Sequence, residues 1–404
     1  MRTSAIPAAL LALALAACAG DATAPPTLDG PLAARAGAGR TAERATAAER
    51  WSAVARGIVS RRETGPLGIA RSFALVSVAQ YDAVIAAESH RGRGPRPSPS
   101  AAAAGAAATV LRAIYPAEAP AIAAQLAADA AYFPAQRATR RADHAAGLAV
   151  GEAVAAVVLA RAASDGSTAR FTGTLPTGPG FWFSAPAPAV PIGVLWGTVR
   201  PWLMESGSQV RPAAPPAFGS PAFAAALAEV RQFSDERTPA QLASAQFWVT
   251  GPGTAGPLGY WTEVGFSLAA QRRYDERRAT RLLAVLHMAG MDASIGCWDA
   301  KYAYSLVRPY QVDPAITTPV GRPNFPAYPS AHSCFSAAAA EVLVGFFPAA
   351  APELRARVAE AGVSRIYAGL HYRFDVDAGQ QIGRDVAALA LANAPRGQER
   401  IVVE

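Results

Sequence analysis

The sequence predicts an all-α fold, a helical bundle. After residue 51, apolar residues recur at a spacing of three and four positions over long segments that show few β-branched alternations. About 350 residues follow Trp51, which is enough to bury a large core. No repeat of fixed period and no clear boundary divides this part, so we expect one helical domain over residues 51–404.

Ten segments carry the helical pattern. None offers an uninterrupted run of eighteen apolar residues, because Glu152 and Glu341 interrupt the two best candidates, so we expect no membrane-embedded bundle. The predicted helices are Ile69–Ala87, Ala101–Tyr115, Pro120–Tyr132, Gln136–Ala163, Pro221–Phe233, Pro239–Trp248, Tyr274–Met291, Ser333–Phe347, Pro352–Ala361 and Val376–Ala392.

The first 50 residues are predicted to lie outside the helical domain. An apolar run from Ile6 to Ala17 is too short to span a bilayer and is typical of a signal peptide, residues 1–17. It ends in Leu15-Ala16-Ala17-Cys18, which resembles a bacterial lipobox, so Cys18 is the expected lipidation site; a plain secretory signal is the alternative. Residues 18–50 are rich in Ala, Gly, Pro and Thr and predict a flexible tether. Either signal places the protein outside the cytoplasm, in the bacterial periplasm or cell envelope.

One internal segment, Asp165 to Ser220, differs from the helical pattern. It holds many Pro and Gly residues together with large aromatic side chains that include Phe181, Trp182, Phe183, Trp196 and Trp202. Long irregular segments in compact domains are often functional, so these aromatics could line a substrate mouth. The more frequent role of such aromatics is to pin a loop to the core.

The only lysine of the chain, Lys301, stands seven residues before Arg308, whereas the other thirty-six basic side chains are arginines. An ammonium is a compact point charge with three donors, and it fits against one oxygen of a small oxyanion better than a planar guanidinium does. A lysine retained against so strong an arginine bias therefore indicates a site.

Two further blocks follow in the sequence. Pro329-Ser330-Ala331-His332 precedes an apolar, alanine-rich run and predicts a helix start with Ser330 near the N-cap, where backbone N–H groups form an anion seat. Ser364-Arg365 is followed by His371 and, four residues later, Asp375, one helical turn away if the stretch is helical. Three cations, two histidines and a carboxylate to orient one of them are a set suited to a multiply charged oxyanion.

The three blocks resemble the signature shared by vanadium-dependent haloperoxidases and the type 2 phosphatidic acid phosphatase superfamily. The resemblance covers about 75 residues, Lys301 to Asp375, and we place the catalytic part at residues 297–395. One position departs from the family, which usually has glycine where this chain has Ala331. The alanine N–H can still serve, provided that the backbone there does not require a positive φ.

The resemblance implies two enzyme activities for one pocket. In a haloperoxidase, vanadate would bind His371 and be held by Lys301, Arg308, Ser330, the Ala331 N–H and Arg365, while His332 handles the proton; hydrogen peroxide and a halide would be the substrates. In an acid phosphatase, His371 would attack a phosphate ester and His332 would protonate the leaving oxygen. An inactive oxyanion-binding module is the third alternative.

Flanking residues favour the haloperoxidase. Trp298 and Phe325 resemble the aromatic pair of chloroperoxidase-type members, where apolar walls would partly desolvate a halide.

Cys297 and Cys334 also flank the signature, and the sequence leaves open whether they form a disulfide or stay free thiols. The net charge of +7 arises from dispersed arginines, so we expect no nucleic-acid partner and no membrane contact beyond the lipid anchor. Whether the chain forms homo-oligomers stays open.

Overall fold

The structure is a computed structural model that describes residues 45–137, 140–185, 190–250, 253–396 and 399–402. The predicted signal peptide, Cys18 and most of the predicted tether lie outside these residues. Within the described residues the fold is all-α, as predicted, and backbone pairing of the β type is confined to one isolated bridge between Phe181 and Leu306.

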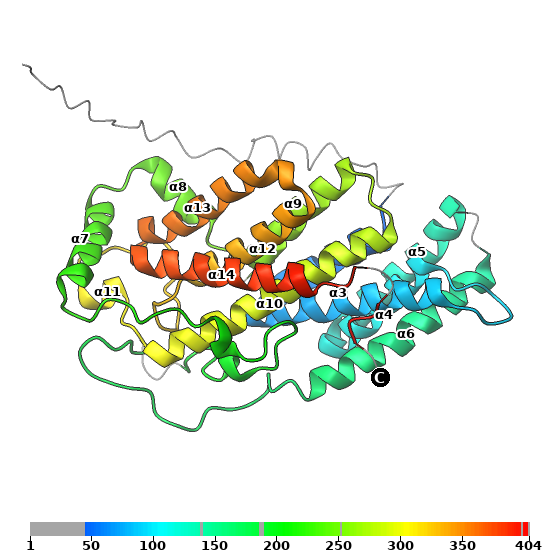
Figure 1. Cartoon of the computed structure of the whole chain (residues 1–404), viewed down its shortest axis with the longest axis horizontal. Helices are drawn as coiled ribbons and strands as arrows, with labels where there is room; N and C mark the ends of the chain where they lie inside the picture. Colours follow the sequence, from blue (N-terminus) through cyan, green and yellow to red (C-terminus); the bar gives the residue numbers. More distant parts are fainter. Residues whose placement is uncertain (1–44, 138–139, 186–189, 251–252, 397–398, 403–404) are drawn as a thin grey trace, which may run out of the picture.

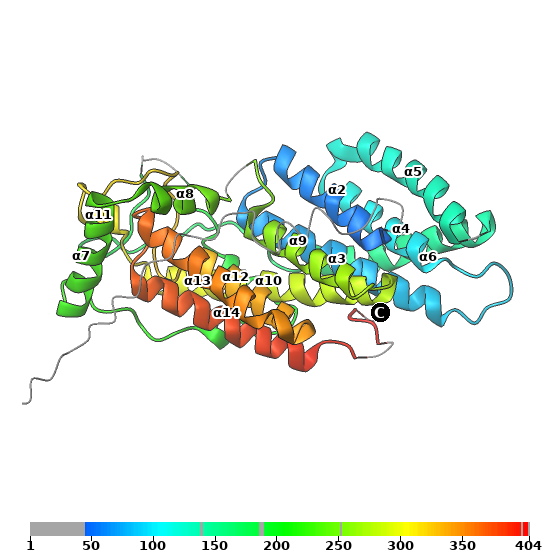
Figure 2. The same ribbon diagram turned by 90° about the horizontal axis from the view of Figure 1, so that it is seen from above.

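Thirteen α-helices make up the described part of the chain, and Figures 1 and 2 show their arrangement. They are α2 (Ala47–Arg61), α3 (Pro66–Ser89), α4 (Pro99–Ile114), α5 (Ala119–Arg137), α6 (Arg141–Ala163), α7 (Pro221–Asp235), α8 (Pro239–Phe247), α9 (Gly256–Gln271), α10 (Glu276–Tyr304), α11 (Pro309–Val312), α12 (Ala331–Phe346), α13 (Ala351–Tyr367) and α14 (Arg373–Asn393).

Helix α10 joins the two halves of the molecule. It packs against α3 of the N-terminal half, and against α12 and α14 of the C-terminal half. In both views α5 and α6 lie at one end of the elongated body, and α7, α8 and α11 lie at the other. The described residues of segment 165–220 are mostly irregular, as expected, and run along the body between these ends.

Helix α10 is longer than the sequence predicted. The prediction ended it at Met291, whereas it continues to Tyr304 and stops where Ser305 adopts a left-handed φ of 47°. The apolar pattern fades after Met291 because polar side chains of this part are buried and satisfied inside the protein: the Asp292 carboxylate accepts three backbone N–H groups from residues 202–204. This extension carries Lys301 into the bundle.

Other helix boundaries also differ from the predictions. Helix α6 begins at Arg141 rather than 136, and α13 continues to Tyr367 rather than 361. Helix α9 was not predicted, because its three glycines and one proline have low helix propensity. Tertiary packing stabilises this helix in the folded protein. Helix α2 begins at Ala47, so the helical domain starts before the expected boundary at Trp51.

Hydrogen bonds at its first turn explain the early start of α2. Thr46 and Glu49 form a reciprocal capping box. The N–H groups of Ala47 and Ala48 each donate to the carboxylate of Glu276, at 2.9 Å, so the acid at the start of α10 also satisfies the N-terminus of α2.

Among the described residues, two helices, α3 and α6, have the length and apolar composition that a membrane span requires. The most apolar window of α3 is 89% buried inside the protein, as in a core helix, whereas that of α6 is 33% buried. Helix α6 meets the criterion although Glu152 interrupts its apolar run. Because of this interruption, the sequence analysis predicted no such span.

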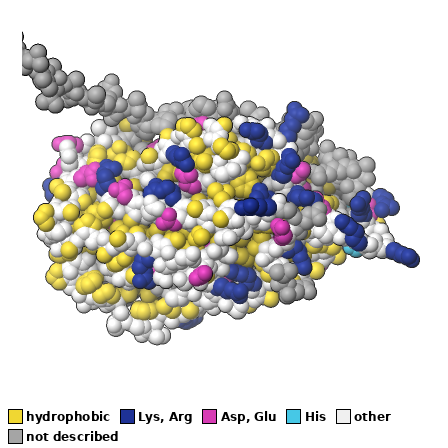
Figure 3. Space-filling view, viewed as in Figure 1, with side chains coloured by type: hydrophobic (Ala, Val, Ile, Leu, Met, Phe, Trp, Pro, Cys, Tyr) yellow, Lys and Arg dark blue, Asp and Glu magenta, His cyan; other side chains and the backbone are white. Residues whose placement is uncertain are grey.

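On the face drawn in Figure 3, arginine and acidic side chains are interspersed rather than gathered into one basic patch.

Close approach of α14 to α12 positions the signature residues. A Cβ atom at Gly379 would lie 2.5 Å from the Ser330 carbonyl oxygen and 2.8 Å from the Ser333 Cβ, so a larger residue would push the helices apart. The Ser330 N–H also donates to the Asp375 carbonyl, at 2.8 Å. The start of α14 is therefore fixed against the start of α12.

The buried imidazole of His287 makes the stability of the bundle depend on pH. Its ring nitrogens lie 2.6 Å from the Ser77 hydroxyl on α3 and 2.8 Å from the Thr262 hydroxyl on α9. Burial, reinforced by the charge of Arg56, lowers the pKa of His287 to about 3. Because the unfolded chain binds this proton near pH 6.5 and the folded chain does not, acid favours unfolding.

His287→Gln is expected to remove this dependence. Between pH 6.5 and about pH 5, the wild type should lose about 2 kcal/mol of unfolding free energy relative to the variant. Urea unfolding of both proteins at several pH values measures the difference. A difference that stays constant across this range would contradict a neutral buried imidazole.

Candidate active site

The predicted site residues converge at one end of the bundle, the end that α11 marks in Figure 1. Each comes from the end of a helix, where the chain leaves or enters the bundle. Lys301 is in the last turn of α10, Arg308 is the N-cap of α11, Ser330 is the N-cap of α12 with Ala331 and His332 in its first turn, Arg365 is in the last turn of α13, and His371 and Asp375 flank the start of α14.

Two of the three site cations are bound by carbonyl oxygens of one loop, residues 325–329. The Lys301 ammonium donates to the carbonyls of residues 326 and 327, at 2.9 and 3.0 Å, and to that of Pro329. The Arg308 guanidinium donates to the Phe325 carbonyl, at 2.9 and 3.1 Å. Because these carbonyl groups are uncharged, the loop orients the two cations without neutralising their charge.

The third cation, Arg365, is placed by other elements. Its guanidinium donates to the carbonyl of Ala245 in α8 and, at 3.0 Å, to the hydroxyl of Ser364. Its side chain is as deeply buried as those of Lys301 and Arg308.

Positive charge exceeds negative charge in this buried region. In the part of the chain that the structure describes, none of the three cations makes an ion pair with a carboxylate. Burial lowers the pKa of Lys301 to about 8 and that of Arg365 to about 9. The carboxylate of Asp375 acts on Lys301 and Arg308 but is shared with a histidine. A bound anion would offset this desolvation, so the pocket fits a multiply charged oxyanion.

His371 is held with one nitrogen directed at Arg308. Its Nε2 lies 3.0 Å from Arg308 Nη1 and its Nδ1 lies 2.9 Å from Asp375 Oδ2. Because a guanidinium can only donate, the proton is assigned to Nδ1 and the lone pair to Nε2. Burial, with the charges of Arg308 and Lys301, holds the pKa of His371 well below its usual value. A neutral imidazole with an oriented lone pair is a ligand or a nucleophile.

Asp375 fixes His371 in place. Its Oδ2 also accepts the Tyr372 N–H, at 3.1 Å. Burial raises the pKa of Asp375 to about 7, opposed by Lys301 and Arg308. The predicted spacing of one helical turn is thus realised at the start of α14.

His332 is held by a residue that the sequence analysis did not identify. Its Nε2 lies 3.0 Å from the Thr250 hydroxyl, in the segment between α8 and α9. Burial, with the charge of Arg365, lowers the pKa of His332 to about 3. It is therefore a neutral base near pH 7, close enough to Arg365, Lys301 and His371 to act on them electrostatically.

The start of α12 supplies uncharged donors. The Ser330 hydroxyl is buried and has no hydrogen-bond partner among the described residues, and its side chain does not cap the helix. Ala331 lies in the α-helix, so its backbone does not need the positive φ that favours glycine. Alanine in place of the family's usual glycine at position 331 therefore leaves the backbone N–H group available. The unpaired hydroxyl beside three buried cations supports the oxyanion assignment.

The predicted aromatic pair lies against Lys301. The rings of Trp298 and Phe325 are 4.9 Å apart between centroids, and the Lys301 ammonium lies 5.0 Å from the Phe325 centroid and 5.7 Å from that of Trp298. Both side chains are buried. One wall of the cation site is therefore apolar.

Cys297 and Cys334 are free, buried thiols in the structure. The Cys297 thiol donates to the Pro329 carbonyl, at 3.8 Å, the same oxygen that Lys301 contacts. Of the two alternatives that the sequence left open, the structure shows the reduced pair.

Comparisons with known proteins found one family match and several similar folds. Residues 279–397 match the family model of the PAP2 superfamily. The matched segment is similar to PAP2-superfamily domains. It contains every residue of the three sequence blocks. No curated protein sequence matches the chain.

Solved structures extend the likeness to most of the chain. The first bacterial vanadium-dependent iodoperoxidase superposes with a TM-score of 0.74 at 23% identity, over 85% of this chain and 94% of that one. A holo-type bacterial vanadium-dependent chloroperoxidase gives 0.63 at 14% identity, over 81% and 92%. Its apo-type structure gives 0.65 at 14% identity, over 81% and 93%. The chain outside the PAP2 segment therefore shares the fold of bacterial vanadium haloperoxidases.

Thr250→Val should test the contact with His332. The substitution keeps the shape of the side chain and removes the hydroxyl, so we expect turnover to fall about tenfold with oxyanion binding unchanged. Thr250→Ser should restore most of the rate. Steady-state kinetics and vanadate binding measure both effects. Equal losses in the two variants would show that the methyl group, rather than the hydroxyl, matters.

Proposed function

We propose that the protein is a vanadium-dependent haloperoxidase that oxidises a halide with hydrogen peroxide to hypohalous acid. The observation that carries the proposal is the Trp298–Phe325 pair, whose tilted rings pack together beside Lys301. An apolar wall next to a cation would partly desolvate a halide and hold it near the oxyanion site. A phosphate ester needs no such wall. The likeness to vanadium haloperoxidases supports the same choice.

The residues present fit vanadate. His371 Nε2 carries the lone pair that would bind vanadate. Arg365, the Ser330 hydroxyl and the Ala331 N–H would donate to its oxygens. Lys301 and Arg308, whose N–H groups donate to backbone carbonyls and to His371, would contribute positive charge. When bound, vanadate supplies the Lewis acid that activates hydrogen peroxide. Asp375 keeps the proton of His371 on Nδ1, so that the lone pair lies on Nε2, which accepts from Arg308 in this structure.

His332 handles the proton in this proposal. Positioned by Thr250, its neutral imidazole would accept a proton from hydrogen peroxide and return it to the water that leaves. The positive charge of Lys301 would favour the oxidation of a halide held beside it. The halide loses two electrons and peroxide is reduced to water, so halide, peroxide and one proton give hypohalous acid and water.

An acid phosphatase is the second candidate, because the His371–Asp375 pair would equally serve a phosphate ester. His371 Nε2 would attack phosphorus, and His332, once protonated, would protonate the leaving oxygen before water releases the phosphate. The PAP2 match supports this chemistry as much as the first.

We further propose that the protein is exported to the cell envelope and anchored by lipid on Cys18. The sequence pattern at Leu15–Cys18 carries this proposal. Metabolic labelling with a fatty acid tests it: the wild type should incorporate label and Cys18→Ala should not.

A paired assay on the purified protein tests the proposed activity. Bromide- and chloride-dependent halogenation of an indicator dye is measured with peroxide and orthovanadate, and hydrolysis of an aryl phosphate is measured without vanadate. Halogenation that requires vanadate supports the haloperoxidase. Phosphate release that vanadate inhibits, without halogenation, would assign the same residues to a phosphatase.

A further inference from the structure

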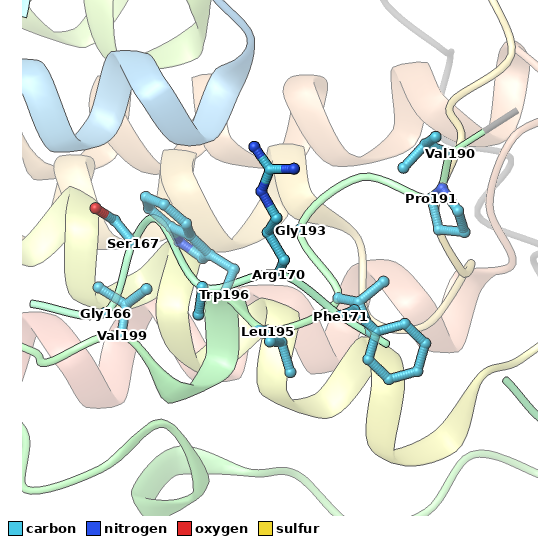
Figure 4. Close-up of a pocket in the computed structure, with 12 residues that line it drawn as sticks. Gly166, Ser167, Arg170, Phe171, Val190, Pro191, Gly193, Leu195, Trp196 and Val199 are labelled. Atoms are coloured by element: carbon cyan, nitrogen blue, oxygen red, sulfur yellow. The ribbon is translucent and has the colours of Figure 1, made fainter. Parts of the chain in front are cut away.

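A cleft of about 520 Å³ opens on the irregular segment beside the aromatic pair (Figure 4). Two stretches of the chain line it, one within residues 166–171 and the other within residues 190–199. None of these residues belongs to the three sequence blocks, so the cleft is a feature separate from the oxyanion site.

The lining of the cleft is apolar with one positive charge. Phe171 and Val190 are 40% and 83% exposed there, together with the partly exposed Leu195. Arg170 is the one charged residue among the described lining, and it has no hydrogen bond or ion pair with another described side chain. Figure 4 shows its guanidinium extending between Trp196 and Val190. An apolar slot with an unpaired guanidinium is complementary to an aromatic anion.

Hydrogen bonds fix both stretches that line the cleft to the helical body. The Trp196 indole N–H donates to the Ser294 hydroxyl on α10, at 2.8 Å. The Asp165 carboxylate accepts the Ser167 N–H at 2.8 Å and the Arg71 guanidinium at 2.7 Å. A ligand would therefore contact a largely preformed surface, and binding would lose little conformational entropy of the loop.

One indole separates the cleft from the oxyanion site. Gly193 lines the cleft with a φ of +73°, and a Cβ atom there would lie 2.6 Å from Trp298 Nε1. The Ile192 carbonyl, next in the chain, accepts that N–H at 3.1 Å. The same Trp298 ring packs on Phe325 beside Lys301 on its other side.

We propose that this cleft binds a small aromatic carboxylate, with the carboxylate on Arg170 and the ring against the apolar lining. The role of this ligand rests on the proposed haloperoxidase activity: it is the organic acceptor that hypohalous acid halogenates. In that step a halogen replaces a ring hydrogen, and the hydrogen leaves with the hydroxyl of hypohalous acid as water.

Isothermal titration with 4-hydroxybenzoate and with uncharged 4-methylphenol tests the binding directly. The wild type should bind 4-hydroxybenzoate about fivefold more tightly than 4-methylphenol, the effect of one exposed ion pair. Arg170→Glu should remove this preference. Arg272→Glu, the same charge change at an exposed site outside the cleft, should keep it. Equal binding of the two ligands by the wild type, or an unchanged preference in Arg170→Glu, would overturn the proposal.

Kinetics test the role of the ligand separately. With halide and peroxide, Arg170→Glu should raise the KM for 4-hydroxybenzoate about fivefold or more and leave triiodide formation, which needs no organic acceptor, unchanged. An unchanged KM would overturn the acceptor role. Absence of halogenation in every variant, with Arg170-dependent binding intact, would refute the proposed activity while the binding site stands.

Discussion

His371→Ala is expected to abolish vanadate retention and lower halogenation by at least about 10³-fold. The imidazole is the proposed ligand of vanadate, with its Nδ1 held by Asp375 and its unprotonated Nε2 directed at Arg308. Its loss also leaves Asp375 buried without its main donor. Equilibrium dialysis against orthovanadate and the dye assay measure the two losses.

His90→Ala is the matched control, because His90 is exposed at the end of α3. Circular dichroism of both variants checks that the bundle persists. If His371→Ala retained full activity in a folded protein, the whole site assignment would fail, whichever of the two reactions the protein catalyses.

His332→Ala should separate binding from turnover. The residue handles a proton but does not hold the oxyanion in this account, so kcat should fall about 10²- to 10⁴-fold while the Kd for vanadate changes little. The loss should exceed that of Thr250→Val, which leaves the imidazole in place. A large rise in Kd with kcat intact would instead make His332 a binding residue.

The sequence alone predicted the fold class and the set of residues that meet at the site. Helical spacing identified most of the helices, because their apolar faces are buried in the bundle. The three blocks were informative because each lies where a helix begins or ends, so local spacing placed Ser330 at an N-cap and Asp375 one turn from His371.

The remaining features depend on contacts between distant parts of the chain. Thr250 is 82 positions from His332 in the sequence, and no motif marks it. The carbonyl groups of residues 325–329 orient the cations through the backbone, which carries no side-chain signature. The continuation of α10 past Met291 was missed for a similar reason, since the partners of Asp292 come from the irregular segment.

Titration of vanadate-free protein with orthovanadate, following bound vanadate and bromide oxidation together, tests the central claim most directly. We expect activity to be absent at the start and to rise in proportion to the vanadate bound, up to one vanadate per chain. Peroxide-dependent bromide oxidation without vanadate, or aryl phosphate hydrolysis that declines as vanadate binds while bromide oxidation never appears, would contradict it.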